Sequence, residues 1–304
     1  MVACGARAWL SPLMFEGFQS GVSRVGEVDI FRRVGGSGPP LLLLHGYPQT
    51  HILWRKIAPD LARNFTVVCP DLRGYGASSK PVPDAANHLY SKRAMAADMV
   101  ALMDGLGFGE FAVVGHDRGG RVAYRLALDH PERVTKIATL DIVPTFANWG
   151  RMREMSIGLA TYHWYFLAQP GGLPERMIGA DPDYYLEEKL RRWSKDFAAF
   201  EPDALAEYKR AFRDPACIAA TCADYRAGAT VDVEHDRSDF GARKIAAPFL
   251  ALWGGKGRLM MEGASQLDVW REWASDARGF PLDCGHFLPE EAPAATLAAL
   301  RDFL

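Results

Sequence analysis

The sequence lacks the features that mark secreted, membrane-spanning and nucleic-acid-binding proteins. Its five cysteines are scattered without paired spacing and leave one over, so neither a disulfide framework nor a zinc site is predicted. No run approaches the roughly 18 apolar residues of a membrane span, and the stretch from Met1 to Phe15 has no recognisable secretory leader. A net charge of -2 gives no electrostatic reason to bind nucleic acid or an anionic membrane. We therefore expect a cytoplasmic protein with a small-molecule ligand.

Internal repeats and low-complexity tracts are also missing, and the length suits one domain with an insertion. A chain of 304 residues is long for a single core and short for two. From 144 to 243 the alternating pattern stops, aromatic residues are frequent, and helical stretches are broken by prolines. We predict a poorly ordered extension over 1–14, an α/β core over 15–143 and 244–304, and a helical cap over 144–243.

Short apolar runs that end in turn residues predict a mostly parallel sheet flanked by helices. Continuous apolar runs are typical of strands that are covered on both faces. Strands are expected at 23–25, 28–33, 41–44, 65–69, 111–114, 134–140, 248–253 and 279–282. Helices of the core are expected at 91–106, from the turn near 117 to about 129, and at 261–274 and 289–304.

The sharpest predicted turn has no serine where an esterase would carry one. The segment Gly115-His116-Asp117-Arg118-Gly119 fits the nucleophile elbow, in which a strained strand-to-helix turn lifts one side chain above a parallel sheet. A carboxylate that attacks an ester gives an anhydride that reverts, but it can displace a leaving group from a saturated carbon through a covalent ester. The alternative is a glycine-rich turn with a solvated aspartate.

An ester on Asp117 would have to be hydrolysed, which requires a base that activates water. His286 follows the last predicted strand, where the chain order of this elbow fold places the base. The loop after strand 248–253 has no acidic residue between 254 and 258 that could orient that base. Asp141, at the carboxyl end of strand 134–140, is the nearest candidate for this task, and a capping role is its alternative.

Two arginines stand three residues apart at the start of the helix that follows the elbow. Arg118 and Arg121 share one face of that helix, at the end where the helix dipole disfavours cations. They therefore suggest a bound anion, and a planar carboxylate fits guanidinium groups best. The alternative is that either arginine pairs with a carboxylate of the cap.

The resemblance that unites these segments is to the haloacetate dehalogenases, and in particular the fluoroacetate dehalogenases, of the α/β-hydrolase superfamily. H-G-Y-P at 45–48, G-H-D-R-G-G-R at 115–121, the missing acid after strand 248–253, H-W in the cap and G-H-F at 285–287 carry it. It implies an α/β-hydrolase fold with an inserted cap, no metal and no organic cofactor. The implied site consists of a nucleophile with its water-activating pair (Asp117, Asp141, His286), a carboxylate clamp (Arg118, Arg121), halide donors (His163, Trp164, Tyr225) and an oxyanion loop (His45, Gly46, Tyr47, Pro48).

The expected reaction is the hydrolysis of a 2-haloacetate to glycolate and halide. Tyr47 replaces the phenylalanine usual in the H-G-F-P version of the loop, which can add a hydroxyl near the site. Two alternatives remain open from the sequence: an epoxide hydrolase with the same aspartate nucleophile, and a binding protein that has kept the fold and lost turnover. Many members of the family are homodimers, and the sequence neither favours nor excludes that assembly.

Overall fold

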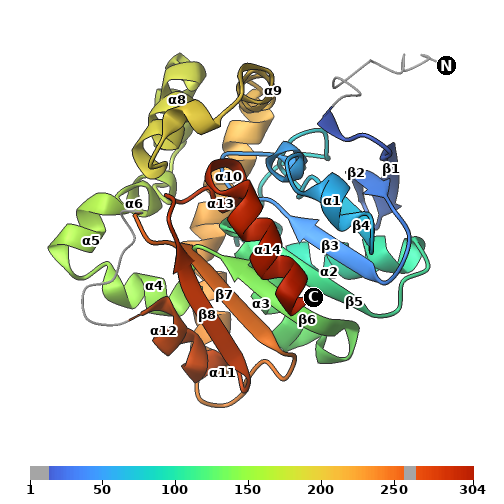
Figure 1. The fold of residues 1–304 in the computed structure, drawn as a ribbon. Coiled ribbons are helices and arrows are strands. Elements are labelled where there is room, and N and C mark those ends of the chain that lie inside the picture. The colour runs from blue at the N-terminus through green and yellow to red at the C-terminus, as the bar shows by residue number, and fades with distance from the viewer. Residues whose placement is uncertain (1–13, 257–264) are drawn as a thin grey trace.

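The computed structural model describes residues 14–256 and 265–304, and their centre is one mostly parallel sheet (Figure 1). Within this part of the chain the sheet has eight strands in the order β1-β2-β4-β3-β5-β6-β7-β8. The pairs β1–β2 and β2–β4 are antiparallel and all later pairs are parallel. The strands are β1 (Gln19–Val25), β2 (Val28–Gly35), β3 (Pro40–Leu44), β4 (Thr66–Pro70), β5 (Phe111–His116), β6 (Val134–Leu140), β7 (Phe249–Gly254) and β8 (Ala277–Leu282).

Helices of the core cover both faces of the sheet, with α14 in front of it and α3 behind it in Figure 1. Because both faces are covered, the central strands are buried along nearly their whole length, and every residue of β5 is buried. The core helices are α1 (Ala58–Leu61), α2 (Lys92–Gly105), α3 (Arg118–Asp129), α12 (Gln266–Trp273), α13 (Leu288–Glu291) and α14 (Pro293–Phe303).

The eight strands predicted from the apolar runs are confirmed, with ends that differ by a few residues. Ser91 caps α2 as expected, since its side chain accepts a hydrogen bond from Ala94 N. The single helix predicted over 289–304 is wrong, because the chain forms α13 and α14 with a break at Ala292, directly before Pro293. The residue before a proline is driven out of the helical region, and φ −134° and ψ 54° at Ala292 agree with that. The extension predicted over 1–14 lies outside the described residues except for Met14, which packs against the core, and the start of the helix predicted at 261 also lies outside them.

Between β6 and β7 the chain forms helices without a strand among the described residues, where the sequence predicted the helical insertion. Several of these helices have proline at their first or second position, where its missing N–H costs nothing. Figure 1 shows α5, α6, α8 and α9 grouped together at one end of the sheet. The helices are α4 (Thr145–Arg151), α5 (Met155–Ala160), α6 (His163–Leu167), α7 (Leu173–Ala180), α8 (Pro182–Trp193), α9 (Pro202–Phe212), α10 (Pro215–Ala229) and α11 (Val231–Asp239).

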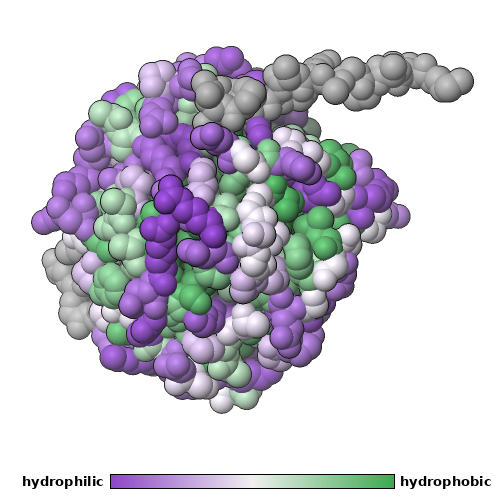
Figure 2. All heavy atoms as spheres, turned by 45° about the vertical axis from the view of Figure 1, so that its right-hand side comes forward, coloured by the Kyte–Doolittle hydropathy of each residue, from purple (hydrophilic) through white to green (hydrophobic). Residues whose placement is uncertain are grey.

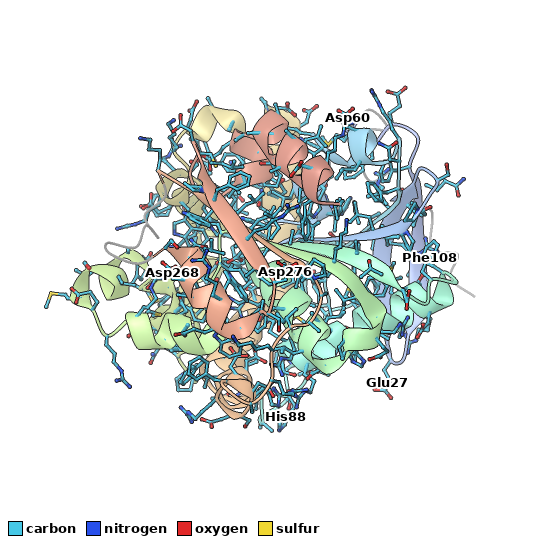
Figure 3. The ribbon with its side chains drawn as sticks, turned by 60° about the horizontal axis from the view of Figure 1, so that its bottom comes forward. Glu27, Asp60, His88, Phe108, Asp268 and Asp276 are labelled. Atoms are coloured by element: carbon cyan, nitrogen blue, oxygen red, sulfur yellow. The ribbon has the colours of Figure 1, made fainter. Side chains whose placement is uncertain are left out.

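Charged residues gather on the outside of the molecule. Figure 2 shows hydrophilic side chains mixed with smaller hydrophobic patches on the face in view. Figure 3 labels Asp268 at the start of α12, where its carboxylate and Ser265 form a reciprocal capping box. None of the described helices is both long enough and apolar enough to cross a bilayer.

Candidate active site

Asp117 occupies the turn between β5 and α3 in a backbone conformation that few residues with a side chain adopt. Its φ is 47° and its ψ is −116°, and only 8% of its surface is exposed. Gly115 and Gly119 permit this turn, because a β-carbon at either position would collide with neighbouring backbone. The strained turn lifts the carboxylate clear of both the strand and the helix, as the elbow motif predicts.

One oxygen of Asp117 is held by the backbone and the other faces His286. Tyr47 N–H donates to Asp117 Oδ1 over 2.8 Å, while Asp117 Oδ2 lies 3.8 Å from His286 Nε2. Burial by itself would raise the pKa of Asp117, but the charges of nearby histidines and arginines outweigh burial and lower it. The group is therefore a carboxylate at neutral pH, with one oxygen free to attack.

Asp141 and His286 form the hydrogen bond expected of a base and the acid that orients it. His286 Nδ1 and Asp141 Oδ2 are 2.6 Å apart, and Asp141 Oδ1 accepts from Gly254 N at 3.1 Å and Gln266 Nε2 at 3.3 Å. Burial lowers the pKa of His286, but the hydrogen bond and charge of Asp141, together with the charge of Asp117, raise it above its usual value. Nε2 of His286 is buried and has no partner among the described residues, so it can accept a proton.

Arg121 is a buried cation, and no carboxylate in the described part of the chain lies within ion-pair distance of it. Only 3% of its surface is exposed. Nη1 donates to Val143 O at 2.8 Å and Thr145 Oγ1 at 3.2 Å, and Nε has no partner there. Burial, followed by repulsion from Arg118, lowers its pKa below the usual arginine value. A buried charge is costly unless it is paired, so an anionic ligand would stabilise this guanidinium.

Arg118 is held differently, because it pairs with Asp224 of α10. Nε donates to Asp224 Oδ2 at 3.1 Å, and Nη2 donates to Oδ1 at 2.5 Å and to the backbone oxygen at 2.9 Å. Lys92 also pairs with Asp224. Arg118 is fully buried and is not among the residues that line the cavity described below. Of its side-chain nitrogens only Nη1 is left without a partner, so a clamp formed with Arg121 would use that atom.

His163, Trp164 and Tyr225 come together from two helices of the insertion. The ring centre of Tyr225 lies 5.6 Å from that of His163 and 5.5 Å from that of Trp164. The Tyr225 hydroxyl and His163 Nδ1 are buried without partners among the described residues. Burial raises the pKa of Tyr225 well above its usual value and lowers that of His163 well below. Both groups are neutral, and the Tyr225 hydroxyl keeps its proton as a hydrogen-bond donor.

The loop 45–48 supports the elbow through its backbone. Gly46 lets the loop approach closely, because a β-carbon there would collide with Asp117. His45 Nε2 accepts a hydrogen bond from Leu72 N at 3.1 Å and so holds the loop in place. The Tyr47 ring lies 5.4 Å from that of Tyr225. The tyrosine in place of phenylalanine therefore lies beside the cluster of His163, Trp164 and Tyr225, while Pro48 follows a cis peptide bond.

Three polar or aromatic neighbours of the site were missed by the sequence analysis. Trp193 of α8 lies 4.5 Å from the His163 ring and 5.6 Å from the His286 ring, and its backbone oxygen accepts from His286 N. Arg151 and Gln266 line the same cavity. None of the three belongs to a local motif, so no signal in the sequence could have singled them out.

Several of these residues line a small cavity at the carboxyl ends of β5 and β6, whereas Arg118, Tyr225 and the loop 45–48 are not among its lining residues. Its volume is about 40 Å³, compared with the roughly 10–15 Å³ that one water needs on this scale. It therefore accommodates a ligand of only a few heavy atoms. Among the described residues it is lined by Asp117, Arg121, Asp141, Ile142, Val143, Asn148, Arg151, Ala160, Thr161, His163, Trp164, Trp193, Gln266 and His286.

Comparison with known proteins agrees with this arrangement. A model of the alpha/beta hydrolase fold matches residues 39–293. The chain is 49% identical to a fluoroacetate dehalogenase of Burkholderia sp over 96% of its own length and 95% of that protein's. It is 35% identical to a soluble epoxide hydrolase of Corynebacterium sp. (strain C12), over 88% and 91% of the two chains. The crystal structure of a protein from Nostoc sp PCC 7120, described as an alpha/beta hydrolase, matches with a TM-score of 0.92 and 55% identity, over 94% and 97% of the chains.

Proposed function

Because the chain belongs to the haloacetate dehalogenase family of the alpha/beta hydrolases, we propose that it hydrolyses 2-haloacetates, including fluoroacetate and chloroacetate, to glycolate and halide. The observation that carries this proposal is Arg121, a buried cation that forms no ion pair among the described residues, in a cavity that also holds the Asp117 nucleophile. A haloacetate supplies the missing negative charge and presents a saturated carbon to the carboxylate. Its few heavy atoms also suit the small cavity.

In the first half-reaction, Asp117 Oδ2 attacks the carbon that carries the halogen. The substrate carboxylate pairs with Arg121 and with Nη1 of Arg118. A carbon–oxygen bond to Asp117 forms as the carbon–halogen bond breaks, and the halogen leaves with the bonding electrons. Neutral donors from His163, Trp164 and Tyr225 stabilise the departing halide. The product is a glycolyl ester of Asp117.

In the second half-reaction, water attacks the carbonyl carbon of that ester. His286 Nε2 takes the proton of the water, and Asp141 stabilises the resulting imidazolium. Negative charge develops on Oδ1, which receives the N–H of Tyr47. When this intermediate collapses, the bond from Asp117 to the glycolate oxygen breaks, and His286 returns its proton to that oxygen. The Asp117 carboxyl group now carries an oxygen atom from water and loses its remaining proton to solvent.

Epoxide hydrolysis is the second candidate, because the unpartnered Tyr225 hydroxyl could donate to an epoxide oxygen. The 35% identity to a soluble epoxide hydrolase also supports it. A neutral epoxide, however, leaves Arg121 without a counter-charge. This argument favours the haloacetate as substrate.

The decisive experiment offers fluoroacetate, chloroacetate and styrene oxide to the purified protein and measures halide, glycolate and diol. We expect halide and glycolate in equal amounts, and no halide from Asp117→Asn, which should still bind haloacetate. Asp276→Asn is the matched control and should retain full activity, because this exposed aspartate (labelled in Figure 3) directly precedes β8, at the edge of the sheet opposite the carboxyl ends of the parallel strands. Diol without halide would instead identify an epoxide hydrolase, and binding without any product in a single turnover would identify a protein that has lost catalysis.

A further inference from the structure

Lys189 is a fully buried lysine of α8 that has no role in the reaction described so far. It has 0% exposure and does not line the cavity. No carboxylate lies within ion-pair distance of its ammonium group among the described residues, since the neighbouring Glu188 pairs with Arg192 at 3.5 Å. Removing an ammonium from water without an anionic partner carries a large cost. The buried ammonium group of Lys189 therefore indicates a function that offsets its desolvation cost.

The surroundings of Lys189 compensate its charge only in part. Its ammonium donates to the Tyr162 hydroxyl and lies 4.2 Å from the ring centre of Tyr162 and 4.9 Å from that of Tyr185. Burial, with a further contribution from Arg192, lowers its pKa to about 8 while Glu188 acts in the opposite direction. The side chain is therefore mostly charged at neutral pH, between two aromatic faces.

The position of Lys189 connects it to the proposed halide donors. It precedes Trp193 by one helical turn on the same face of α8, and Trp193 packs 4.5 Å from the ring of His163. Tyr162, which receives the ammonium hydrogen bond, directly precedes His163 in the chain. After burial, the charge of Lys189 is the largest influence on the pKa of His163. Lys189 thus lies beside the segment of the chain that carries His163.

The three proposed halide donors are all neutral groups, so none of them brings a net charge to the departing ion. Arg121 is required by the substrate carboxylate, and the charge of Arg118 is balanced by Asp224. Lys189, Arg118 and Arg121 are the lysine and arginine charges that act on His163, and of these three Lys189 is the one without another task. In an interior from which water is excluded, one unpaired charge acts over several ångströms.

We propose that Lys189 is a positioning residue of the halide site, whose buried charge beside His163 and Tyr162 stabilises the halide as it leaves. The proposal rests on the proposed function. Fluoride depends on this charge most, because its bond to carbon is strong and the transition state places much of the negative charge on the leaving atom. Bromide leaves readily and depends on it least. Lys189 would therefore determine how well the enzyme accepts fluorinated relative to brominated substrates.

The test replaces Lys189 by methionine, which has similar length and no charge. With fluoroacetate, kcat should fall by about 30-fold or more, and with bromoacetate by less than about 3-fold. Lys189→Arg should restore most of the fluoroacetate turnover. Arg191→Met, which removes a largely exposed cation from the same helix, should change neither rate.

A second measurement does not depend on turnover. Bromide and chloride quench tryptophan fluorescence on contact, and Trp164 and Trp193 both line the cavity, so quenching reports halide binding. The halide concentration for half-maximal quenching should rise about tenfold in Lys189→Met and in Lys189→Gln. If halide binding to the wild type weakens in the Lys189 variants as expected, but the wild type releases no halide from any haloacetate, the proposed function is wrong while the role of Lys189 in halide binding is supported. Equal losses of turnover with fluoroacetate and bromoacetate, with unchanged halide binding, would show that Lys189 only supports the fold and would overturn the inference.

Discussion

The carboxylates in the sheet half of the site and the donors in its helical half differ in their hydrogen bonding. At the ends of β5 and β6, the carboxylates of Asp117 and Asp141 accept short hydrogen bonds from Tyr47 N and His286. On the helices, the hydroxyl of Tyr225 and Nδ1 of His163 have no partner among the described residues. Buried polar groups are normally satisfied. Under the proposed function, the carboxylates of the sheet half are therefore held ready to react, and we expect an anion to complete the hydrogen bonds of the helical half.

Removal of the base from the sheet half should have the largest effect. In His286→Asn, the first half-reaction needs no base and should proceed once, so turnover should fall at least about a thousandfold while one halide per enzyme is released. Mass spectrometry of the variant after incubation with chloroacetate should find Asp117 carrying a glycolyl group. If one halide is released per enzyme molecule but Asp117 is found unmodified, the two-step scheme is contradicted.

The wild-type pH profile provides the complementary measurement. The hydrogen bond that His286 donates to Asp141 raises the pKa of His286 despite burial, and only the neutral imidazole can take a proton from water. Turnover should therefore fall about tenfold per pH unit below that pKa and level off above it. Ester formation removes the charge of Asp117, one of the contributions that raise this pKa, so the base should be more readily neutral in the second step than in the free enzyme.

The same contrast explains how far the sequence could predict the site. Asp117, Asp141 and His286 follow strands whose apolar runs are visible in the sequence, and the carboxyl ends of parallel strands meet at one edge. The partner of Arg118 could not be found in this way, because Asp224 is 106 positions away in a helix without a strand pattern. Trp193 and Arg151 likewise depend on how the helical insertion packs over the sheet, which no local motif encodes.

Removal of a donor from the helical half should have an intermediate effect. Tyr225→Phe deletes a hydroxyl that has no partner among the described residues, so the fold should not lose a hydrogen bond. A hydrogen bond to a charged group contributes about 1.5–3 kcal/mol, which predicts a fall in fluoroacetate turnover of roughly 10- to 150-fold. Stopped-flow measurement of fluoride release isolates this step. Tyr184→Phe alters a mostly exposed tyrosine and should leave fluoroacetate turnover unchanged. If Tyr225→Phe also leaves it unchanged, the Tyr225 hydroxyl does not bind the departing halide.

Arg151 should have the smallest effect, because it faces the cavity without a fixed partner. It is half-buried, lines the cavity, and forms no ion pair in the described part of the chain. Burial lowers its pKa while Asp141 acts in the opposite direction, so it remains a cation that attracts an anionic substrate. Arg151→Gln should lower kcat/KM for chloroacetate about 3- to 10-fold at low ionic strength with little change in kcat.

Salt screens such attraction, so the difference in kcat/KM between Arg151→Gln and wild type should shrink as the salt concentration rises. The exposed Arg153→Gln is the control, and a loss that persists in high salt would assign Arg151 a direct contact with the bound substrate instead.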